Sequence, residues 1–107
     1  MTGFRNAPPV GPWAARHDGL LFVHADCVLD MGVYAAARRE LDAGAAAIRH
    51  LIIDCEEVDT VRNSGLAALI AIDVIARSEG FDVSVLDAPE SVRGRLASWC
   101  KVVAWLE

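Results

Sequence analysis

Short apolar runs alternate along the chain with longer segments in which the apolar residues have helical spacing. Residues 20–25 (LLFVHA) and 51–54 (LIID) are apolar runs typical of strands, and residues 81–86 (FDVSVL) alternate as a strand does. The run at 51–54 lacks alternation, which favours a central strand covered on both faces. Residues 13–16 precede the turn signal Asp18-Gly19, so we expect an N-terminal hairpin with an edge strand.

Two helices are predicted, one before and one after the central strand in the sequence. The first begins after Asp30, whose carboxylate can accept free amide protons of the first turn, and ends at Gly44. The second and clearest covers residues 64–80, where Gly80 ends the helix. Asn63 or Ser64 is expected to cap its first turn with a side-chain oxygen.

The C-terminal part of the chain adds a short helix and a last extended segment. Residues 91–99 predict an amphipathic helix, and residues 102–106 a final strand or an extended tail. Trp99 and Trp105 are expected to pack on the edge of the sheet.

Taken in order, these elements predict one small α/β domain. Strand–helix–strand units with short connections imply parallel neighbours, so we expect a mixed, mostly parallel sheet of four or five strands with the helices packed mainly on one side. Three of the four prolines fall within residues 1–12, which are predicted to be an irregular lead-in, and residues 13–107 form the domain.

Composition excludes some classes of function. The formal net charge of the 107 residues is −5, which argues against nucleic acid as a partner. The longest apolar run, residues 66–72, stops at Asp73 and is far shorter than the roughly 18 residues of a membrane span. The first residues lack the pattern of a signal peptide, so we expect a cytoplasmic protein with no direct membrane insertion.

The three cysteines show no pattern of a metal or redox site. Cys27, Cys55 and Cys100 are far apart, with no CxxC spacing. We expect reduced thiols that are buried as small hydrophobes.

Catalytic constellations are weak throughout the sequence. His17, His24 and His50 lack metal-ligand spacing and are expected to be structural, and a nucleophile–base pair of Cys55 with His24 or His50 would need the fold to bring them together. There is no glycine-rich phosphate loop. We therefore expect no enzyme, no cofactor and no metal, and a solvated loop for the acidic run that lies at Glu56, Glu57 and Asp59.

The stretch LIIDCEEVDTVRNSGLAALIAI resembles the signature of the STAS domain, the family of anti-sigma-factor antagonists. In that signature an apolar strand ends in aspartate, and after a polar loop Asp-Ser-Ser-Gly-Leu opens a helix. Asp54 matches the strand-end aspartate, and Ser64, Gly65 and Leu66 match the last three motif residues. The order of elements over residues 13–107 fits the family as well, so the resemblance implies the STAS fold and a protein-binding function.

The chain departs from the signature at two positions. Asn63 stands where the resemblance implies the serine that a partner kinase phosphorylates, and Arg62 stands where the preceding aspartate would be. Asparagine has no hydroxyl to accept a phosphoryl group, so Asn63 is a degenerate phosphosite and docking would not depend on phosphorylation. Arg62 would attract an acidic group of a partner or an anion, or else pair with the acidic loop before it.

The second helix carries two apolar stripes. Leu69, Ile72, Ile75 and Ala76 should face the sheet. Leu66, Ile70 and Val74 form the second stripe, which is flanked by a predicted Asp73–Arg77 ion pair. This stripe either contacts a neighbouring helix or forms an exposed ridge of the kind that marks a protein partner. With this ridge, the resemblance implies that the partner-binding residues are Asp59, Arg62, Asn63, Ser64, Gly65, Leu66, Ile70 and Val74.

Three binding roles remain open at this point. The favoured one is antagonism of an anti-sigma factor, by docking on a kinase-like regulator so that a sigma factor is released. The second is a cytoplasmic STAS subunit of a membrane complex for lipid or anion transport, such as an ABC transporter. The third is a scaffold subunit of a signalling assembly. A homodimer is compatible with all three.

Overall fold

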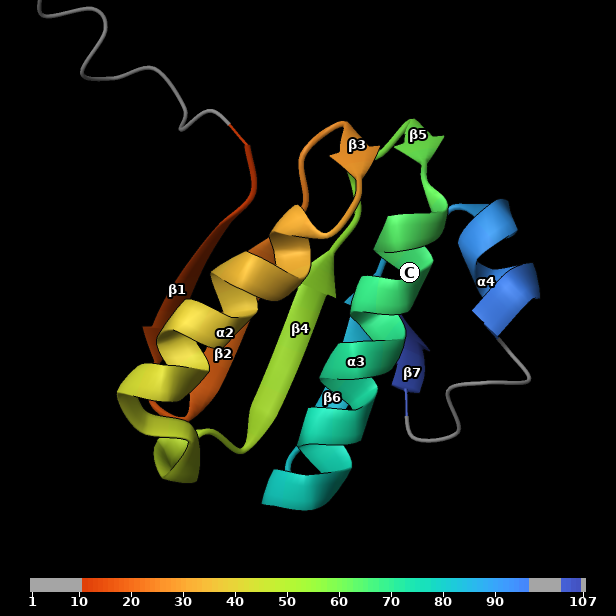
Figure 1. Ribbon diagram of the computed structural model, residues 1–107. Coiled ribbons are helices and arrows are strands. Elements are labelled where there is room, and N and C mark those ends of the chain that lie inside the picture. The colour runs from red at the N-terminus through yellow and green to blue at the C-terminus, as the bar shows by residue number, and fades with distance from the viewer. Residues whose placement is uncertain (1–10, 97–102, 107) are drawn as a thin grey trace, which may run out of the picture.

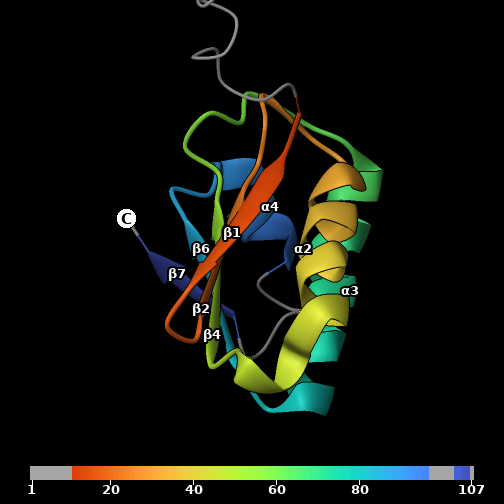
Figure 2. The ribbon, with the colours of Figure 1, turned by 90° about the vertical axis from the view of Figure 1, so that its left-hand side faces the viewer.

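The computed structural model describes residues 11–96 and 103–106, and its centre is one sheet with two long helices across one face (Figure 1). Figure 2 shows helices α2 and α3 on the same side of that sheet. In chain order the elements are β1 (Trp13–His17), β2 (Leu20–His24), β3 (Val28–Leu29), α2 (Gly32–Gly44), the 3-10 turn η1 (Ala45–Ala47), β4 (His50–Asp54), β5 (Thr60–Val61), α3 (Asn63–Glu79), β6 (Asp82–Leu86), α4 (Glu90–Leu96) and β7 (Val103–Leu106).

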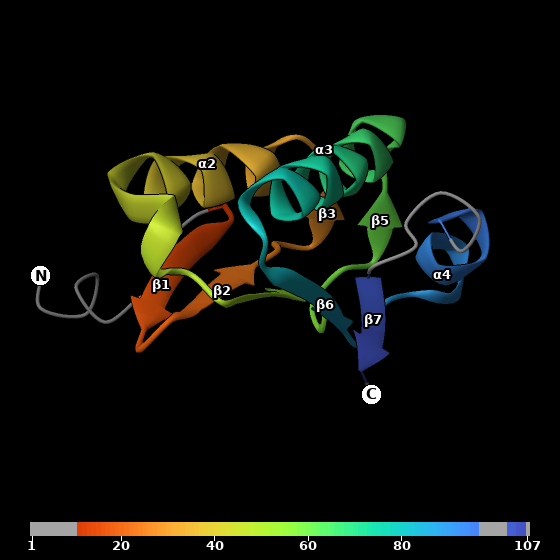
Figure 3. The ribbon, with the colours of Figure 1, turned by 90° about the horizontal axis from the view of Figure 1, so that it is seen from below.

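The main sheet has five strands in the order β1-β2-β4-β6-β7. β1 and β2 are antiparallel, and each of the other neighbouring pairs is parallel. Figure 3 shows α2 and α3 side by side above the sheet, with α4 beyond the β7 edge. The predicted small α/β fold, with a mixed and mostly parallel sheet and helices mainly on one side, is confirmed.

The face of the sheet below the helices is wholly aliphatic in its three central strands. Alternate residues of β2, β4 and β6 stand in register across it and are at most 1% exposed: Leu21, Val23, Leu51, Ile53, Val83 and Val85. Ile52 lies between two of them in β4 and is only half-buried. The expectation that β4 is covered on both faces was therefore wrong, because the described helices cover one face.

Two positive φ angles make the hairpin turn that the sequence predicts. Asp18 has a φ of 48° and Gly19 a φ of 85°, as required at both central positions of the turn type whose twist suits a two-residue hairpin. β1 and β2 pair from Trp13↔His24 to His17↔Leu20 on either side of it. The turn therefore fixes the register of the edge strand.

The C-terminal ends of the two long helices, at Gly44 and Gly80, were predicted, but the residues predicted to cap their N-termini do not hold that position. Asp30 Oδ1 accepts a hydrogen bond from the backbone N–H of Gly32 at 2.9 Å, although Met31 holds the N-cap position of α2. At the end of α3, Gly80 is left-handed with a φ of 85°, and its N–H donates to the Ala76 carbonyl at 2.7 Å. Gly80 thus ends the helix as expected.

Two very short strands, β3 and β5, were not predicted. They pair in parallel through Val28↔Thr60 and Leu29↔Val61. Strands of two residues are too short to show a periodicity, so the sequence carried no signal for them. They matter because they hold the segment before α2 against the segment that leads into α3.

The C-terminal predictions are met as far as the description reaches. α4 is seen from Glu90 to Leu96, with Val92 wholly buried, and β7 forms the predicted final strand. The rest of the predicted helix over residues 91–99, with Trp99 and Cys100, lies outside the described residues, as do residues 1–10 of the lead-in. Trp105 lies in β7, paired in register with Val85.

Candidate functional site

The junction from β5 to α3 places three consecutive polar residues at the surface. Arg62, Asn63 and Ser64 are all exposed, and the next residue, Gly65, is buried. Arg62 is extended, with φ −98° and ψ 158°, and its N–H donates to the Leu29 carbonyl at 3.0 Å. We call residues 62–64 the corner.

Gly65 is required at this place by close packing rather than by its backbone angles. A Cβ atom at this position would lie 2.2 Å from the carbonyl oxygen of Leu29 and 2.6 Å from its carbonyl carbon. Backbone atoms cannot move away as a flexible side chain can. The glycine therefore lets the first turn of α3 lie directly on β3, and this contact sets the position of the corner.

The predicted cap of α3 is wrong. The helix begins at Asn63, the N-cap position is Arg62, and no side chain caps the first turn. The Asn63 side chain instead accepts a hydrogen bond on Oδ1 from Nη2 of Arg95, in α4, at 3.1 Å. Asn63 therefore ties α4 to α3, a contact between residues 32 positions apart that no local pattern could reveal.

The second stripe of α3 is only partly a ridge. Leu66 is 7% exposed and belongs to the core, Ile70 is half-buried, and Val74 is 55% exposed. Within the described residues, Val74 and Met31 are the exposed large hydrophobic side chains. The stripe that should face the sheet behaves as predicted at Leu69, Ile72 and Ala76, which are at most 2% exposed, while Ile75 is half-buried.

The Asp73–Arg77 pair forms as predicted but is not a surface pair. Arg77 Nη2 lies 2.7 Å from Asp73 Oδ2, and the Asp73 side chain is wholly buried. The other carboxylate oxygen, Oδ1, has no hydrogen-bond partner. Removing Arg77 would leave a buried carboxylate with neither oxygen hydrogen-bonded. The ion pair is therefore needed for the stability of the fold.

Arg62 does not pair with the acidic loop. No described carboxylate forms an ion pair with its guanidinium. Glu57 instead lies 3.5 Å from His24, and Asp59 Oδ1 accepts from the Thr60 hydroxyl at 3.0 Å. The arginine is therefore available to a group outside the described part of the chain.

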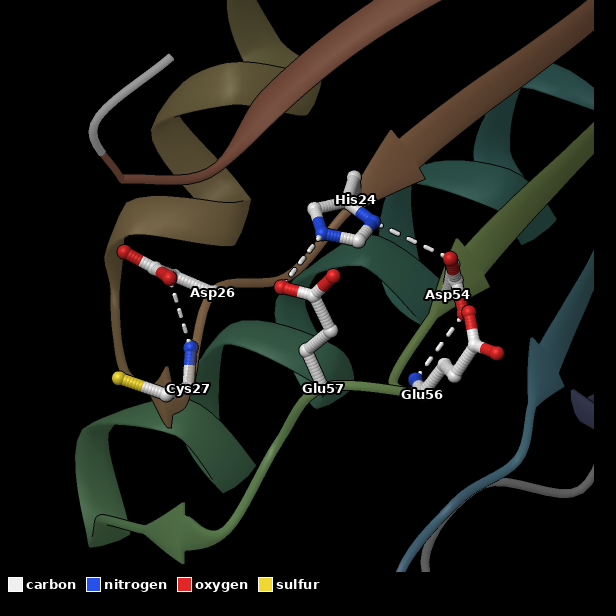
Figure 4. A network of polar contacts seen from close by, with 6 residues as sticks. All are labelled: His24, Asp26, Cys27, Asp54, Glu56 and Glu57. Atoms are coloured by element: carbon white, nitrogen blue, oxygen red, sulfur yellow. Dashed lines mark hydrogen bonds and ion pairs between the residues drawn. The ribbon is translucent and has the colours of Figure 1, made fainter. Parts of the chain in front are cut away.

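A second polar cluster lies where β2 and β4 end (Figure 4). His24 Nδ1 is 3.1 Å from Asp54 Oδ2, and its Nε2 is 3.5 Å from Glu57 Oε1. Asp54 Oδ1 accepts from the Glu56 N–H at 3.0 Å, and the imidazole stacks on Trp13 with ring centroids 5.1 Å apart. Sequence reasoning missed this cluster; the parallel register His24↔Asp54 makes it, and a correct pairing of the two strands would have found it.

The other candidate catalytic groups are held in structural contacts. His50 Nε2 lies 2.7 Å from the buried Ser84 hydroxyl, and His17 is 86% exposed beside Asp18. The described residues contain no group of three His, Cys, Asp or Glu side chains that could hold a metal ion.

The cysteines differ from one another. Cys55 is buried as expected, and burial, followed by the charges of Asp54 and Asp87, raises the pKa of its thiol from 9.0 to about 12. A thiol of this kind is protonated at neutral pH and is a poor nucleophile. Cys27 is exposed, which corrects the expectation that the cysteines are buried; its place in the loop between β2 and β3 keeps it at the surface.

A family model described as the STAS domain matches residues 12–99. The chain belongs to the STAS domain family. The STAS domain here is similar in structure to the anti-sigma factor antagonist SpoIIAA in its unphosphorylated form, with a TM-score of 0.72 and 11% identity over 91% of this chain and 87% of that one. It is also similar to the protein TM1081, with a TM-score of 0.68 and 14% identity over 88% of this chain and 78% of that one.

A transporter contains a similar STAS-like portion. The structure of the murine anion transporter Slc26a9 matches with a TM-score of 0.62 and 11% identity, over 91% of this chain but only 19% of that one. A search of curated proteins found no match to the sequence. At these identities the structural likenesses show the fold of the STAS domain and nothing finer.

No helix among the described residues of this STAS domain is long and apolar enough to cross a membrane.

Proposed function

We propose that this STAS domain regulates transcription by binding another protein, a kinase-like anti-sigma factor, in the bacterial cytoplasm. The observation that carries the proposal is the corner: Arg62, Asn63 and Ser64 are exposed at the start of α3, and none of them caps the helix. Arg62 and Ser64 make no side-chain hydrogen bond or ion pair within the described residues, and Asn63 makes one, to Arg95, so this exposed surface can contact a partner. The fold shared with an anti-sigma factor antagonist supports this class of partner.

The proposed docking surface contains the corner and the outer side of α3. Val74, which is 55% exposed, and the half-buried Ile70 supply its apolar part. Gly65 and Leu66 are buried under this surface and contribute indirectly, because they hold the first turn of α3 against β3. Asp59 lies exposed just before β5 and completes the set at the loop side.

Docking is proposed to be independent of phosphorylation. Asn63 has no hydroxyl, and its side-chain oxygen accepts a hydrogen bond from Arg95. A partner kinase could therefore bind this surface without modifying it. Binding, rather than catalysis, is favoured because the buried thiol of Cys55, with a pKa of about 12, is a poor nucleophile.

The test uses a candidate kinase-type anti-sigma factor that is encoded beside this protein, titrated calorimetrically in the presence of ATP. We expect wild type to bind and Val74→Glu to lose at least about tenfold in affinity, since a charge replaces an apolar contact. Ala35→Glu, at an exposed position of α2, is the matched control and should bind as wild type does. Equal binding by Val74→Glu would remove α3 from the proposed surface.

The proposed loss of the phosphorylation site at position 63 has its own test. Asn63→Ser restores a hydroxyl at the motif position, and radiolabelled ATP then reports transfer of phosphate to the protein. We expect label on the serine variant and none on wild type. Label on wild type, at Ser64 for example, would contradict phosphorylation-independent docking.

A second candidate function is that of a separate STAS subunit in a membrane transport complex for lipids or anions. The similarity to the STAS-like portion of the Slc26a9 anion transporter favours it. Co-expression with neighbouring permease and ATPase genes, followed by purification from detergent-solubilised membranes, separates the two candidates. Particles of high mass in light scattering of the protein alone would instead favour the scaffold role.

A further inference from the structure

Two arginines are neighbours of Asn63, one in sequence and one in space. Arg62 is its neighbour in sequence and is exposed, and the exposed Arg95 reaches it from α4 with an Nη2–Oδ1 distance of 3.1 Å. Neither guanidinium forms an ion pair with a carboxylate in the part of the chain that the structure describes. The corner and the adjacent Arg95 therefore present two positive charges that no carboxylate of the described residues pairs with.

This positive spot stands against the charge of the whole protein. The chain carries a formal net charge of −5, so most surfaces of the molecule would repel an acidic partner. None of the three carboxylates in the acidic loop before β5 forms an ion pair with either arginine, and Glu57 lies beside His24 instead. A local reversal of charge sets the orientation of a partner more than it sets the total affinity.

An apolar strip begins at the same place. Positions 63, 67, 70 and 74 follow helical spacing along one side of α3, so the exposed Ala67, the half-buried Ile70 and the exposed Val74 lie in line with Asn63. The strip is narrow, since Leu66 beside it is buried. A partner segment that fits must therefore place charge at the N-terminal end of α3 and an apolar side chain about three turns further on, at Val74.

We infer that the corner recognises a protein segment that carries carboxylates, followed by an apolar side chain that packs on Val74. This inference rests on the proposed docking surface and adds the chemistry of the partner. Carboxylates suit guanidinium groups because two parallel N–H···O bonds can form.

The experiment selects peptides from a random display library on immobilised wild-type protein and measures their affinities by fluorescence anisotropy. The variants are Arg62→Glu combined with Arg95→Glu, Val74→Glu, and Arg39→Glu as the control, since Arg39 is exposed on α2. Thermal melts confirm that each variant is folded; an acidic residue is favourable at position 62, before the first turn of α3, but unfavourable at position 95, in the last turn of α4.

We expect enriched peptides to be acidic and to bind the double reversal at least about tenfold more weakly, as loss of two exposed charge pairs implies. Arg39→Glu should bind unchanged, and the difference should shrink between about 0.05 M and about 0.5 M salt. Neutral or basic peptides, equal binding by the double reversal, or no enrichment at all would overturn the inference.

Two outcomes separate this inference from the proposed function. Peptides that lose affinity for Val74→Glu but not for the double reversal would support the docking surface and contradict only the acidic nature of the segment. Peptides that bind both variants as tightly as wild type would show that the proposed docking surface is wrong as well. Anionic lipid vesicles captured through the two arginines, with no peptide enriched, would assign the corner to a membrane surface and overturn the inference.

Discussion

The first turn of α3 has an inner side and an outer side that differ in what the fold asks of them. On the inner side, Gly65 lies against the backbone of Leu29 and Leu66 is part of the core. On the outer side, Arg62, Asn63 and Ser64 are exposed and none caps the helix. Adjacent residues thus divide between two tasks: the inner pair fixes the position of the turn, and the outer three form its exposed surface, where only Asn63 makes a side-chain hydrogen bond within the described residues, to Arg95.

The largest expected effect is at the inner glycine. Gly65→Ala would place a methyl group 2.2 Å from a backbone oxygen, so strands or helix must shift, at a cost of about 3 kcal/mol or more in the free energy of unfolding. Gly94→Ala is the matched control, since a Cβ there meets nothing within 4 Å; it should stabilise by up to about 1 kcal/mol. Urea unfolding followed by circular dichroism measures both, and a stable Gly65→Ala protein would refute the close-packing argument.

Leu66→Ala comes next. It removes a side chain that is 7% exposed and should cost about 2–4 kcal/mol, with the spread set by how far the neighbours relax. Val74→Ala, on the exposed side of the same helix, should cost less than about 0.5 kcal/mol. The same urea titration compares them; similar losses would mean that the two sides of α3 are not distinct.

A smaller effect on stability concerns the buried thiol of Cys55, which directly follows β4. Burial and the charges of Asp54 and Asp87 raise the pKa of Cys55 from 9.0 to about 12, so the folded state keeps the proton that the unfolded state releases. The stabilisation is fully present below pH 9.0 and is lost as the pH rises toward about 12, by about 1 kcal/mol at pH 10.

The control for that prediction is Cys55→Ala, whose stability should fall less between pH 8 and pH 10 than that of wild type. Thiol alkylation at neutral pH, mapped by mass spectrometry, should label the exposed Cys27 long before Cys55. Rapid labelling of Cys55 in the folded protein would contradict its burial.

The smallest effects on stability belong to the outer side. Arg62→Ala and Ser64→Ala should each change the free energy of unfolding by less than about 0.5 kcal/mol, because neither side chain makes a hydrogen bond or ion pair within the described residues. Asn63→Ala should cost slightly more, since it frees Arg95. Thermal melts suffice as the measurement, and a loss above about 1 kcal/mol at Arg62 would show that the fold does use the corner.

The order of elements was predictable because each long element has a clear pattern and clear ends. The turn at Asp18-Gly19, the stop at Gly80 and the apolar runs of β2, β4 and β6 are local features, and the structure keeps all of them. The strand–helix–strand units with short connections then implied that the neighbouring strands are parallel, and the resemblance to the STAS signature agreed with this order of elements.

The candidate site was less predictable because its contacts join distant residues. A helical wheel cannot show that β3 lies beside the start of α3, so it could not decide whether Leu66 is covered or part of an exposed ridge; the residue is buried. The bond from Arg95 to Asn63 and the pairing of His24 with Asp54 depend on tertiary neighbours 32 and 30 positions away. Only the register of the strands and the position of α4 reveal them.

The missing methyl group at Gly65 has a consequence for engineering. Because the close contact at Gly65 fixes the first turn of α3, the exposed residues Arg62 and Ser64 can be varied together without changing the interior, while Asn63 is kept for its hydrogen bond from Arg95. Variants of this one domain that each bind a different partner protein, without cross-reaction, could then be selected.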